Sequence, residues 1–325
     1  MMNPLPDQQD FLDAELRIHD HIRETPVERS PWLSEACSGD VFLKLENYQV
    51  TGSFKIRGVM NTLLSMSDDE RKRGVVAAST GNHGAAVAYG MKTLHCPGII
   101  FVPENAESVK LDAIRALGGE VRIHGEDCVI AETFARQYAQ QERMTYISPY
   151  NDPDVILGQG TIGVELHRQL DRIDVIYIAV GGGGLLSGIA GCLKQVQPVL
   201  EVVGCSPENS PVLCRSLEAG RVLDMESAPT LSDGTAGGME KDAITFAHGR
   251  ELIDRFVLVT ESEIADGVRQ ILQRHHMLIE GAAGVTIAAF LRERNKLRGK
   301  RIAIVLCGAN ISAEKLCHIL TDSQG

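Results

Sequence analysis

Lys55 is the side chain best placed to do covalent chemistry. It ends the Thr-Gly-Ser-Phe-Lys segment at 51–55, between an apolar strand-like stretch at 41–45 and a helix-like stretch at 56–64. A lysine at a helix N-terminus meets the positive end of the helix dipole, which disfavours its ammonium form. A partly desolvated amine of this kind can form a Schiff base with a carbonyl compound. Lysines are also common on surface helices, and we expect Lys44 to be an ordinary surface residue of that kind.

A run of four glycines, Gly181, Gly182, Gly183 and Gly184, is the second chemical feature, with Leu185 after it. It follows a strand-like stretch, and parallel sheets place ligands where their strands end. Glycines there let several backbone N–H groups approach one anion at a helix N-terminus. The dinucleotide pattern G-x-G-x-x-G fails in every frame, and no Gly-Lys-Ser/Thr follows. We therefore expect a single phosphate of a small cofactor, the alternative being a turn needed only for tight packing.

A second polar turn lies at 79–84, again between a strand-like and a helix-like stretch. It reads Ser79, Thr80, Gly81, Asn82, His83 and Gly84. Its backbone amides are suited to a carboxylate for the same electrostatic reason. A polar turn with an asparagine in a left-handed conformation is the alternative for this segment taken alone.

Strand-like and helix-like segments alternate from about residue 74 to the end. The strand-like runs are continuously apolar, which is typical of parallel strands covered on both faces, and the alternation indicates an open α/β sheet. We predict strands at 75–78, 98–102, 120–123, 146–148, 175–180, 201–204, 256–259 and 301–306. We predict helices at 85–94, 108–117, 128–141, 185–195, 263–278 and 282–292.

A turn-rich segment at 149–153 interrupts this alternation and is the predicted domain junction. It divides the chain into a large cofactor-binding domain, 1–73 plus 152–325, and a small substrate-carboxylate domain, 74–151. Residues 208–242 have the least regular pattern, and we expect them to form a loop over the site.

Composition narrows the class of protein. The chain has 325 residues, 44% of them hydrophobic, and a net charge of -11. So acidic a chain is a poor partner for nucleic acid or an anionic membrane. Eight scattered cysteines without a Cys-x-x-Cys pair do not support a zinc ribbon or a thioredoxin-type site, and they fit a cytoplasmic protein. The first residues lack the pattern of a signal peptide.

An uncharged stretch at 175–193 approaches the length of a membrane span. It contains six glycines, however, four of them consecutive. A strand, a glycine turn and a buried helix account for it better than one membrane helix.

Four motifs together resemble the serine/threonine dehydratase family. They are the segments 51–55, 79–83 and 181–185, and Cys307 with the Gly-Ala-Asn that follows it. The members are fold-type II pyridoxal-phosphate enzymes, and serine racemase is a close relative. The resemblance covers nearly the whole chain and implies two open, mostly parallel sheets flanked by helices.

The resemblance also implies roles for individual residues. Lys55 would carry pyridoxal 5'-phosphate and move the Cα proton of the substrate, with Phe54 beside the pyridine ring. Asn82 would bind the ring hydroxyl, and Cys307 would face the ring nitrogen. The phosphate would lie on the amides of Gly181, Gly182, Gly183, Gly184 and Leu185. The carboxylate of the amino-acid substrate would lie among Ser79, Thr80, Gly81 and His83.

The implied reaction is β-elimination of water from a β-hydroxy amino acid of the L-threonine or L-serine type, giving a 2-oxo acid and ammonia. A neutral Cys307 thiol stabilises a protonated ring nitrogen less well than a carboxylate does, which disfavours a long-lived carbanion. That suits prompt loss of a hydroxyl group rather than transamination.

Several positions depart from the family pattern. Thr80 stands where serine racemase has its second acid–base serine, so racemisation stays an alternative. The positions near 206–213 that hold a cation in some relatives read Ser206, Ser210 and Val212, with Glu208 out of phase, so we expect no metal. The loop at 231–238 resembles the variant found in dehydratases of hydroxyectoine breakdown, so a specialised substrate, a hydroxyectoine derivative or another 3-hydroxy amino acid, is a further alternative.

Other readings and expectations complete the sequence analysis. A β-replacement enzyme on the same cofactor and a non-catalytic binding protein remain alternatives. Glu280, near the site in relatives, is equally suited to capping a helix. We expect no C-terminal regulatory domain of the kind found in biosynthetic threonine dehydratases. By analogy with relatives we expect a homo-oligomer, a dimer or a tetramer, without nucleic-acid or membrane partners.

Overall fold

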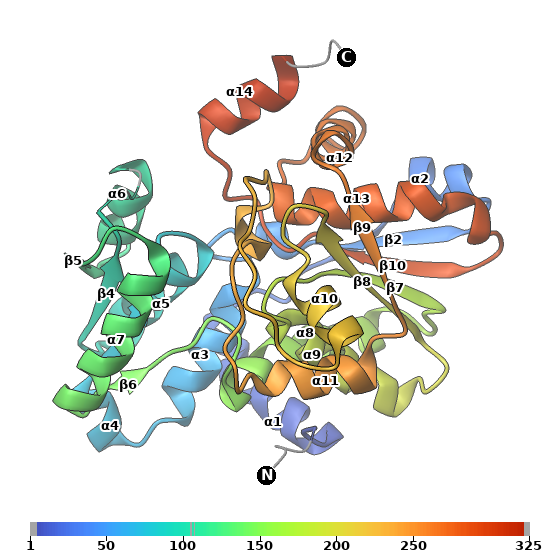
Figure 1. Ribbon diagram of the computed structural model, residues 1–325. Helices are drawn as coiled ribbons and strands as arrows, with labels where there is room; N and C mark the ends of the chain where they lie inside the picture. Colours follow the sequence, from blue (N-terminus) through green and yellow to red (C-terminus); the bar gives the residue numbers. More distant parts are fainter. Residues whose placement is uncertain (1–4, 105, 107, 322–325) are drawn as a thin grey trace.

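The computed structural model describes residues 5–104, 106 and 108–321 (Figure 1). Two separate β-sheets with flanking helices make up the fold, as the sequence predicts. The helices are α1 Gln8–Ile18, α2 Pro31–Cys37, α3 Lys55–Ser65, α4 Asp68–Arg73, α5 Asn82–Leu94, α6 Ser108–Ala116, α7 Cys128–Glu142, α8 Pro153–Gln169, α9 Gly184–Val196, α10 Val212–Ala219, α11 Ile244–Leu252, α12 Glu261–His275, α13 Gly281–Glu293 and α14 Ala313–Thr321.

The larger sheet has the strand order β1-β2-β10-β7-β8-β9. Its strands are β1 Val27–Arg29, β2 Asp40–Lys44, β7 Val175–Ala179, β8 Glu201–Pro207, β9 Arg255–Val259 and β10 Arg301–Val305. Every pair is parallel except β1 with β2, which is antiparallel. β1 was not predicted, because three residues at a sheet edge carry too little apolar pattern to be recognised.

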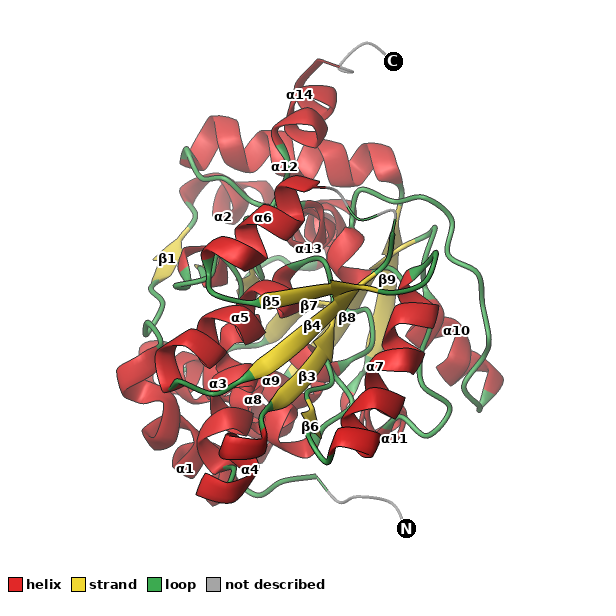
Figure 2. Ribbon diagram, turned by 90° about the vertical axis from the view of Figure 1, so that its left-hand side faces the viewer, coloured by secondary structure: helices red, strands yellow, loops and turns green. Residues whose placement is uncertain are grey.

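The smaller sheet is wholly parallel, with the order β5-β4-β3-β6. Its strands are β3 Val75–Ala78, β4 Gly98–Val102, β5 Glu120–Ile123 and β6 Thr145–Tyr146, and they face the viewer in Figure 2. The strand predicted at 146–148 begins and ends earlier. Ser148 leaves the sheet because its hydroxyl accepts hydrogen bonds from the backbone N–H groups of Tyr150 and Asn151.

Helix α8 was not predicted. Asp152 begins it by accepting hydrogen bonds from the backbone N–H groups of Asp154 and Val155, with Pro153 in the first turn. A Cβ atom on Gly158 would lie 2.5 Å from the Cα of Gly58 in α3. Glycines therefore let α8 approach its neighbours closely, and the same glycines break the apolar periodicity by which helices are recognised.

The segment at 208–242 is less irregular than predicted, because it contains α10 and a short 3-10 helix, Asp233–Thr235. The remaining residues of the segment have no regular secondary structure. The name "site loop" is used below for residues 231–243. Hydrogen bonds from this loop to α7 and to the segment 148–151 set its position relative to the two sheets.

Two large apolar cores stabilise the fold. One lies around the larger sheet and includes residues of β7, β10, α9 and α13. The other joins α3 to the smaller sheet through residues such as Ile56, Val59 and Met60, which pack with Val75 and Val87. Since α3 starts at Lys55, the position of that lysine depends on how α3 packs between the two sheets.

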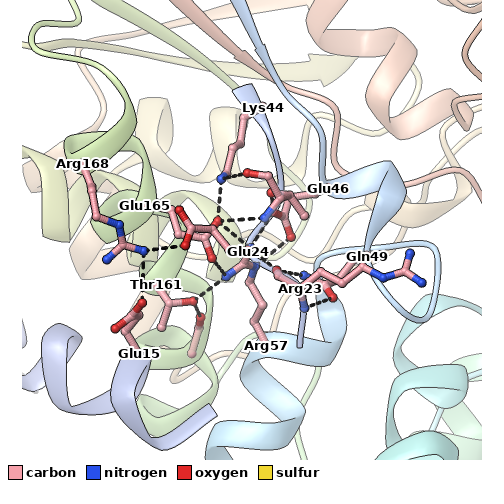
Figure 3. Close-up of polar contacts among 12 residues, drawn as sticks. Glu15, Arg23, Glu24, Lys44, Glu46, Gln49, Arg57, Thr161, Glu165 and Arg168 are labelled. Carbon is pink, nitrogen blue, oxygen red and sulfur yellow. Dashed lines mark hydrogen bonds and ion pairs between the residues drawn. The ribbon is translucent and has the colours of Figure 1, made fainter. Parts of the chain in front are cut away.

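A buried ion network fixes α3 against the larger sheet (Figure 3). Arg57 donates to Glu46 at 2.8 Å and to Glu165 of α8 at 2.6 Å, and Lys44 pairs with the same Glu165 at 2.5 Å. All four side chains are buried. The expectation of a surface Lys44 is therefore wrong: it closes a neutral set of two cations and two carboxylates, which allows charges to be buried.

Candidate active site

Lys55 and Cys307 come together because β2 and β10 are neighbours in the larger sheet. Cys307 follows β10, and its carbonyl accepts a 3.1 Å hydrogen bond from the backbone N–H of Phe54. One residue earlier, Ser53 forms a β-bridge with Gly308. These contacts place the first residue of α3 beside the segment that follows β10.

The Lys55 amine has one hydrogen bond to the main chain. Its Nζ donates to the carbonyl oxygen of Pro149 at 2.6 Å, in the segment that joins the two sheets. Burial lowers the pKa of this amine to about 8, against the opposing effect of nearby Cys307 and Glu280. The deprotonated form is thus accessible near neutral pH, and burial is the main cause.

The glycine run occupies the turn between β7 and α9. Gly183 has a φ of +87°, a left-handed conformation that residues with a Cβ rarely adopt. A Cβ on Gly182 would lie 2.4 Å from the ring of Tyr150, and one on Gly181 would lie 2.8 Å from the backbone of Thr235. The absence of side chains therefore allows the glycine run to pack directly against Tyr150 and against Thr235 of the site loop.

The surroundings of the glycine run suit a phosphate group. The first turn of α9, where Leu185 lies, leaves backbone N–H groups without helical partners. Two hydroxyls, Ser187 in this turn and Thr245 of α11, are buried without a hydrogen-bond partner in the described part of the chain. Thr245 Oγ1 lies 3.5 Å from where a Cβ of Gly183 would be. Donors of this kind at a helix start fit a phosphate monoester such as that of pyridoxal 5'-phosphate.

The polar turn at 79–84 joins β3 to α5. Ser79, Thr80 and Gly81 form the turn itself, and Ser79 Oγ accepts a 3.2 Å hydrogen bond from the Gly81 N–H. His83 is buried, and its Nε2 lies 2.9 Å from the carbonyl oxygen of Ile147. Burial lowers the pKa of His83 to about 3, so the ring is neutral and Nε2 donates to that carbonyl.

Asn82, the first residue of α5, is held from both ends of its amide. Its Nδ2 donates to the two carboxylate oxygens of Glu280, at 2.8 and 3.0 Å. Its Oδ1 accepts a 2.6 Å hydrogen bond from Nδ2 of Asn310. Glu280 is the N-cap residue of α13 by its place in the backbone, but its side chain makes no hydrogen bond to that helix and binds Asn82 instead.

The two remaining ionisable groups of the site, Glu280 and Cys307, are buried. Burial raises the pKa of Glu280 to about 7. Burial, with the nearby Glu280 carboxylate, also raises the pKa of the Cys307 thiol well above its usual value. Cys307 is therefore a neutral thiol.

The structure thus brings Lys55, Cys307 and Asn82 into one neighbourhood around Glu280, which interacts electrostatically with Lys55 and Cys307 and accepts hydrogen bonds from Asn82. In the described part of the chain, no hydrogen bond joins Lys55 to Ser79, Thr80 or Gly81. Five residues around the site were not predicted from the sequence: Pro149, Tyr150, Ser187, Thr245 and Glu240. For Pro149 and Tyr150 the available signal was the turn-rich composition of 149–153. That composition indicates a turn but not a binding role.

Neither a metal site nor a membrane span is found among the described residues. No group of three His, Cys, Asp or Glu side chains is arranged to hold a metal ion there. Glu208 instead pairs with Arg292 at 3.4 Å. No helix within 5–104 and 108–321 is long and apolar enough to cross a membrane, and the uncharged stretch at 175–193 divides into β7, the glycine turn and α9.

Comparisons with known proteins show the family to which the chain belongs. Residues 18–308 match the family described as pyridoxal-phosphate dependent enzymes. The chain is 38% identical over 312 residues to L-threonine ammonia-lyase of Thermotoga maritima, covering 96% of this chain and 77% of that protein. It is 35% identical over 314 residues to the catabolic L-threonine dehydratase of Escherichia coli, covering 95% and 94%. The structure of maize serine racemase superposes with a TM-score of 0.91 at 28% identity, covering 98% and 97%.

Proposed function

Because the chain belongs to the family of pyridoxal-phosphate dependent enzymes, we propose that it removes water from L-threonine and L-serine to give a 2-oxo acid and ammonia. The observation that carries the proposal is the Lys55 amine, whose pKa is lowered to about 8 and which lies 2.6 Å from the Pro149 carbonyl in a site with a neutral thiol. The names of the relatives supply the substrate class.

The residues of the site divide into cofactor-binding and substrate-binding groups in this proposal. Lys55 would hold the cofactor, and Phe54, directly before it, would lie against the ring. The hydroxyls of Ser187 and Thr245 join the amides of the glycine run and Leu185 in binding the phosphate. Bound in this way, pyridoxal phosphate supplies an electron sink for the bonds at the Cα atom of an amino acid. In this proposal Cys307 would face the ring nitrogen, and the amide of Asn82 would bind the ring hydroxyl.

The chain itself supplies the proton transfers that the reaction requires. Once freed by the substrate, the neutral Lys55 amine takes the proton from Cα, and the ammonium group so formed gives a proton to the β-hydroxyl group, which leaves as water. The enamine that is released tautomerises and takes up one water as it loses ammonia. Threonine thus gives 2-oxobutanoate and ammonia, and serine gives pyruvate and ammonia.

The substrate carboxylate is proposed to lie at the turn of Ser79, Thr80 and Gly81, beside His83. The start of α5 directs backbone N–H groups and the positive end of the helix dipole to this point. His83 is neutral and its Nε2 donates to Ile147, so in this proposal the backbone N–H groups, and not a charged ring, bind the carboxylate.

The test is release of 2-oxo acid and ammonia by the purified protein with pyridoxal phosphate, given L-threonine and L-serine separately. Equal amounts of both products from either substrate are expected. No release from either, with cofactor bound, would overturn the proposal and favour a specialised β-hydroxy substrate. Chiral analysis of the unreacted serine is part of the same assay, because accumulation of D-serine would instead identify a racemase of the kind that maize serine racemase represents.

We further propose that the enzyme works in the cytoplasm as a homo-oligomer. Six buried cysteines carry free thiols, which fits a reducing compartment. Relatives are the basis for the oligomer, a dimer or a tetramer. Size-exclusion chromatography with light scattering measures its mass directly.

A further inference from the structure

Glu240 joins three parts of the molecule that surround the site. It belongs to the site loop, and its Oε1 accepts a 2.6 Å hydrogen bond and ion pair from Arg136 of α7, beside the smaller sheet. Its Oε2 accepts a 2.7 Å hydrogen bond from Asn151, and Ser148 Oγ lies 3.4 Å from Oε1. Its backbone N–H donates to the Tyr150 hydroxyl at 2.7 Å. One residue therefore connects the site loop, α7 and the segment 148–151.

The segment 148–151 in turn supports the reacting groups. Pro149 supplies the carbonyl that accepts from Lys55 Nζ. Tyr150 lies so close to the glycine run that a Cβ on Gly182 would meet its ring at 2.4 Å. Asn151 Oδ1 accepts a 2.9 Å hydrogen bond from the backbone N–H of Ile244, at the start of α11. The next residue, Thr245, is the buried hydroxyl beside Gly183.

Charge and packing make this connection specific to a carboxylate. Arg136 stacks over the ring of Tyr146 with its guanidinium carbon 4.2 Å from the ring centre, and it also pairs with Glu132 at 2.9 Å. The side chains of Arg136 and Glu240 are only 35% and 25% exposed. A charge-assisted pair that is partly shielded from water is stronger than a fully exposed one. A neutral side chain at 240 would leave Arg136 with its pair to Glu132 and its contact with Tyr146 but without its ion pair to the site loop.

We infer that Glu240 is a positioning residue: it ties the site loop and α7 to the segment 148–151, and through that segment it sets where the Lys55 amine and the glycine run lie. This inference rests on the proposed function for its kinetic part only. Within the described part of the chain, Glu240 makes its hydrogen bonds with Arg136, Ser148, Tyr150 and Asn151 and none with Lys55. It acts through Pro149 and Tyr150.

The experiment compares Glu240→Ala and Glu240→Gln with the wild type. The matched control is Glu226→Gln, an exposed glutamate of the same irregular segment. Hydrogen–deuterium exchange, followed by mass spectrometry on the protein without added cofactor, measures peptides covering 145–151 and 231–243. Faster exchange in both peptides is expected for the two Glu240 variants and in neither for the control, because loss of the carboxylate frees both segments.

Steady-state kinetics on the holoenzyme form the second arm. We expect kcat to fall about 10²-fold in Glu240→Ala with KM changed much less, since displacement of reacting groups by about 1 Å has an effect of that size. Arg136→Met should resemble Glu240→Gln, and the double variant should be no worse than either single variant, because the two side chains act as one pair.

The outcomes separate the inference from the proposed function. Faster exchange confined to 231–243, or unchanged exchange with a reduced kcat, would overturn the positioning role. If the wild type releases no product from threonine or serine, the proposed function fails. The hydrogen–deuterium exchange measurement still tests whether Glu240 connects the site loop to the segment 148–151. Faster exchange in both peptides, with a kcat loss and a nearly constant KM, would support it.

Discussion

Asn82 Nδ2 lies 2.8 and 3.0 Å from the two carboxylate oxygens of Glu280, although the two residues are 198 positions apart in the chain. The amide begins the helix that follows β3 of the smaller sheet, and the carboxylate precedes α13 on the larger sheet. Asn310 holds the other end of the same amide. The contact thus joins the two halves of the site and fixes the orientation of Asn82.

The protonation of Glu280 is expected to make the stability of the protein depend on pH. Burial raises the pKa of this carboxyl to about 7, so the folded state keeps a proton that the unfolded state, with a pKa of about 4.3, has lost. The free energy of unfolding contributed by this group therefore falls as pH rises from about 4.3 to 7. Glu280→Gln removes the group, and its free energy of unfolding relative to the wild type should rise by up to about 3 kcal/mol between pH 5 and 8.

Urea denaturation of both proteins at the two pH values measures that difference. An identical difference at pH 5 and pH 8 would show that Glu280 is ionised throughout and contradict the prediction.

Uptake of the cofactor by the apoenzyme should follow the titration of Lys55. Only the neutral amine attacks a carbonyl, so the rate should rise with pH to a midpoint near pH 8 rather than near the value of about 10.4 for free lysine. Stopped-flow absorbance of the bound cofactor measures the rate. Glu280→Gln should move the midpoint to lower pH, because the negative charge of Glu280 raises the pKa of Lys55. Lys55→Ala should bind without the absorbance change, and a midpoint near 10 in the wild type would refute the assignment.

The buried ion network should be costly to break. Glu165→Gln leaves Lys44 and Arg57 with too little negative charge, and the loss of stability should be about 3–5 kcal/mol. Asp40→Asn, which breaks an exposed ion pair with Arg29, is the control and should cost no more than about 1 kcal/mol. Urea denaturation at neutral pH distinguishes them. Equal losses of unfolding free energy in the two variants would mean that the buried network is no more costly to break than an exposed ion pair.

Gly183→Ala should weaken both the fold and the cofactor site. A non-glycine residue at a φ of +87° costs about 1–2 kcal/mol, and the new Cβ would lie 3.1 Å from Leu213 and Thr245. We expect the dissociation constant of pyridoxal phosphate to rise more than about tenfold, which is about 1.4 kcal/mol. Gly220→Ala shares the left-handed conformation, with a φ of +70°, and has no neighbour within 4 Å. Gly220→Ala should lose a similar free energy of unfolding but keep its affinity for pyridoxal phosphate, and equilibrium titration measures that affinity. Equal losses of affinity in both variants would show that the glycine run has no specific role in binding the cofactor.

Much of the fold could be predicted from the sequence. The pattern of apolar runs predicted strands within one or two residues for β3, β4, β5, β7 and β10, because a parallel strand buried on both faces has a continuous apolar signal. The family and its cofactor were also predicted correctly, as the relatives show. α8 was not predicted, because Gly158 and the other glycines of this helix serve close packing and interrupt the apolar periodicity by which helices are recognised. The individual roles of Asn82, Thr80 and the other site residues stay predictions.

The sequence by itself determined the local features: Lys55 at a helix start, the glycine run at a strand end, and the order of the four motifs. Each depends on residues adjacent in the chain. Only the tertiary structure decided which groups meet across long separations. It buried Lys44 against Glu165, it placed Glu280 on Asn82, and it set Glu240 between Arg136 and Asn151. The physical reason is that burial and pairing of charge depend on the whole packed chain, whereas helix starts and glycine turns depend on a few neighbouring residues.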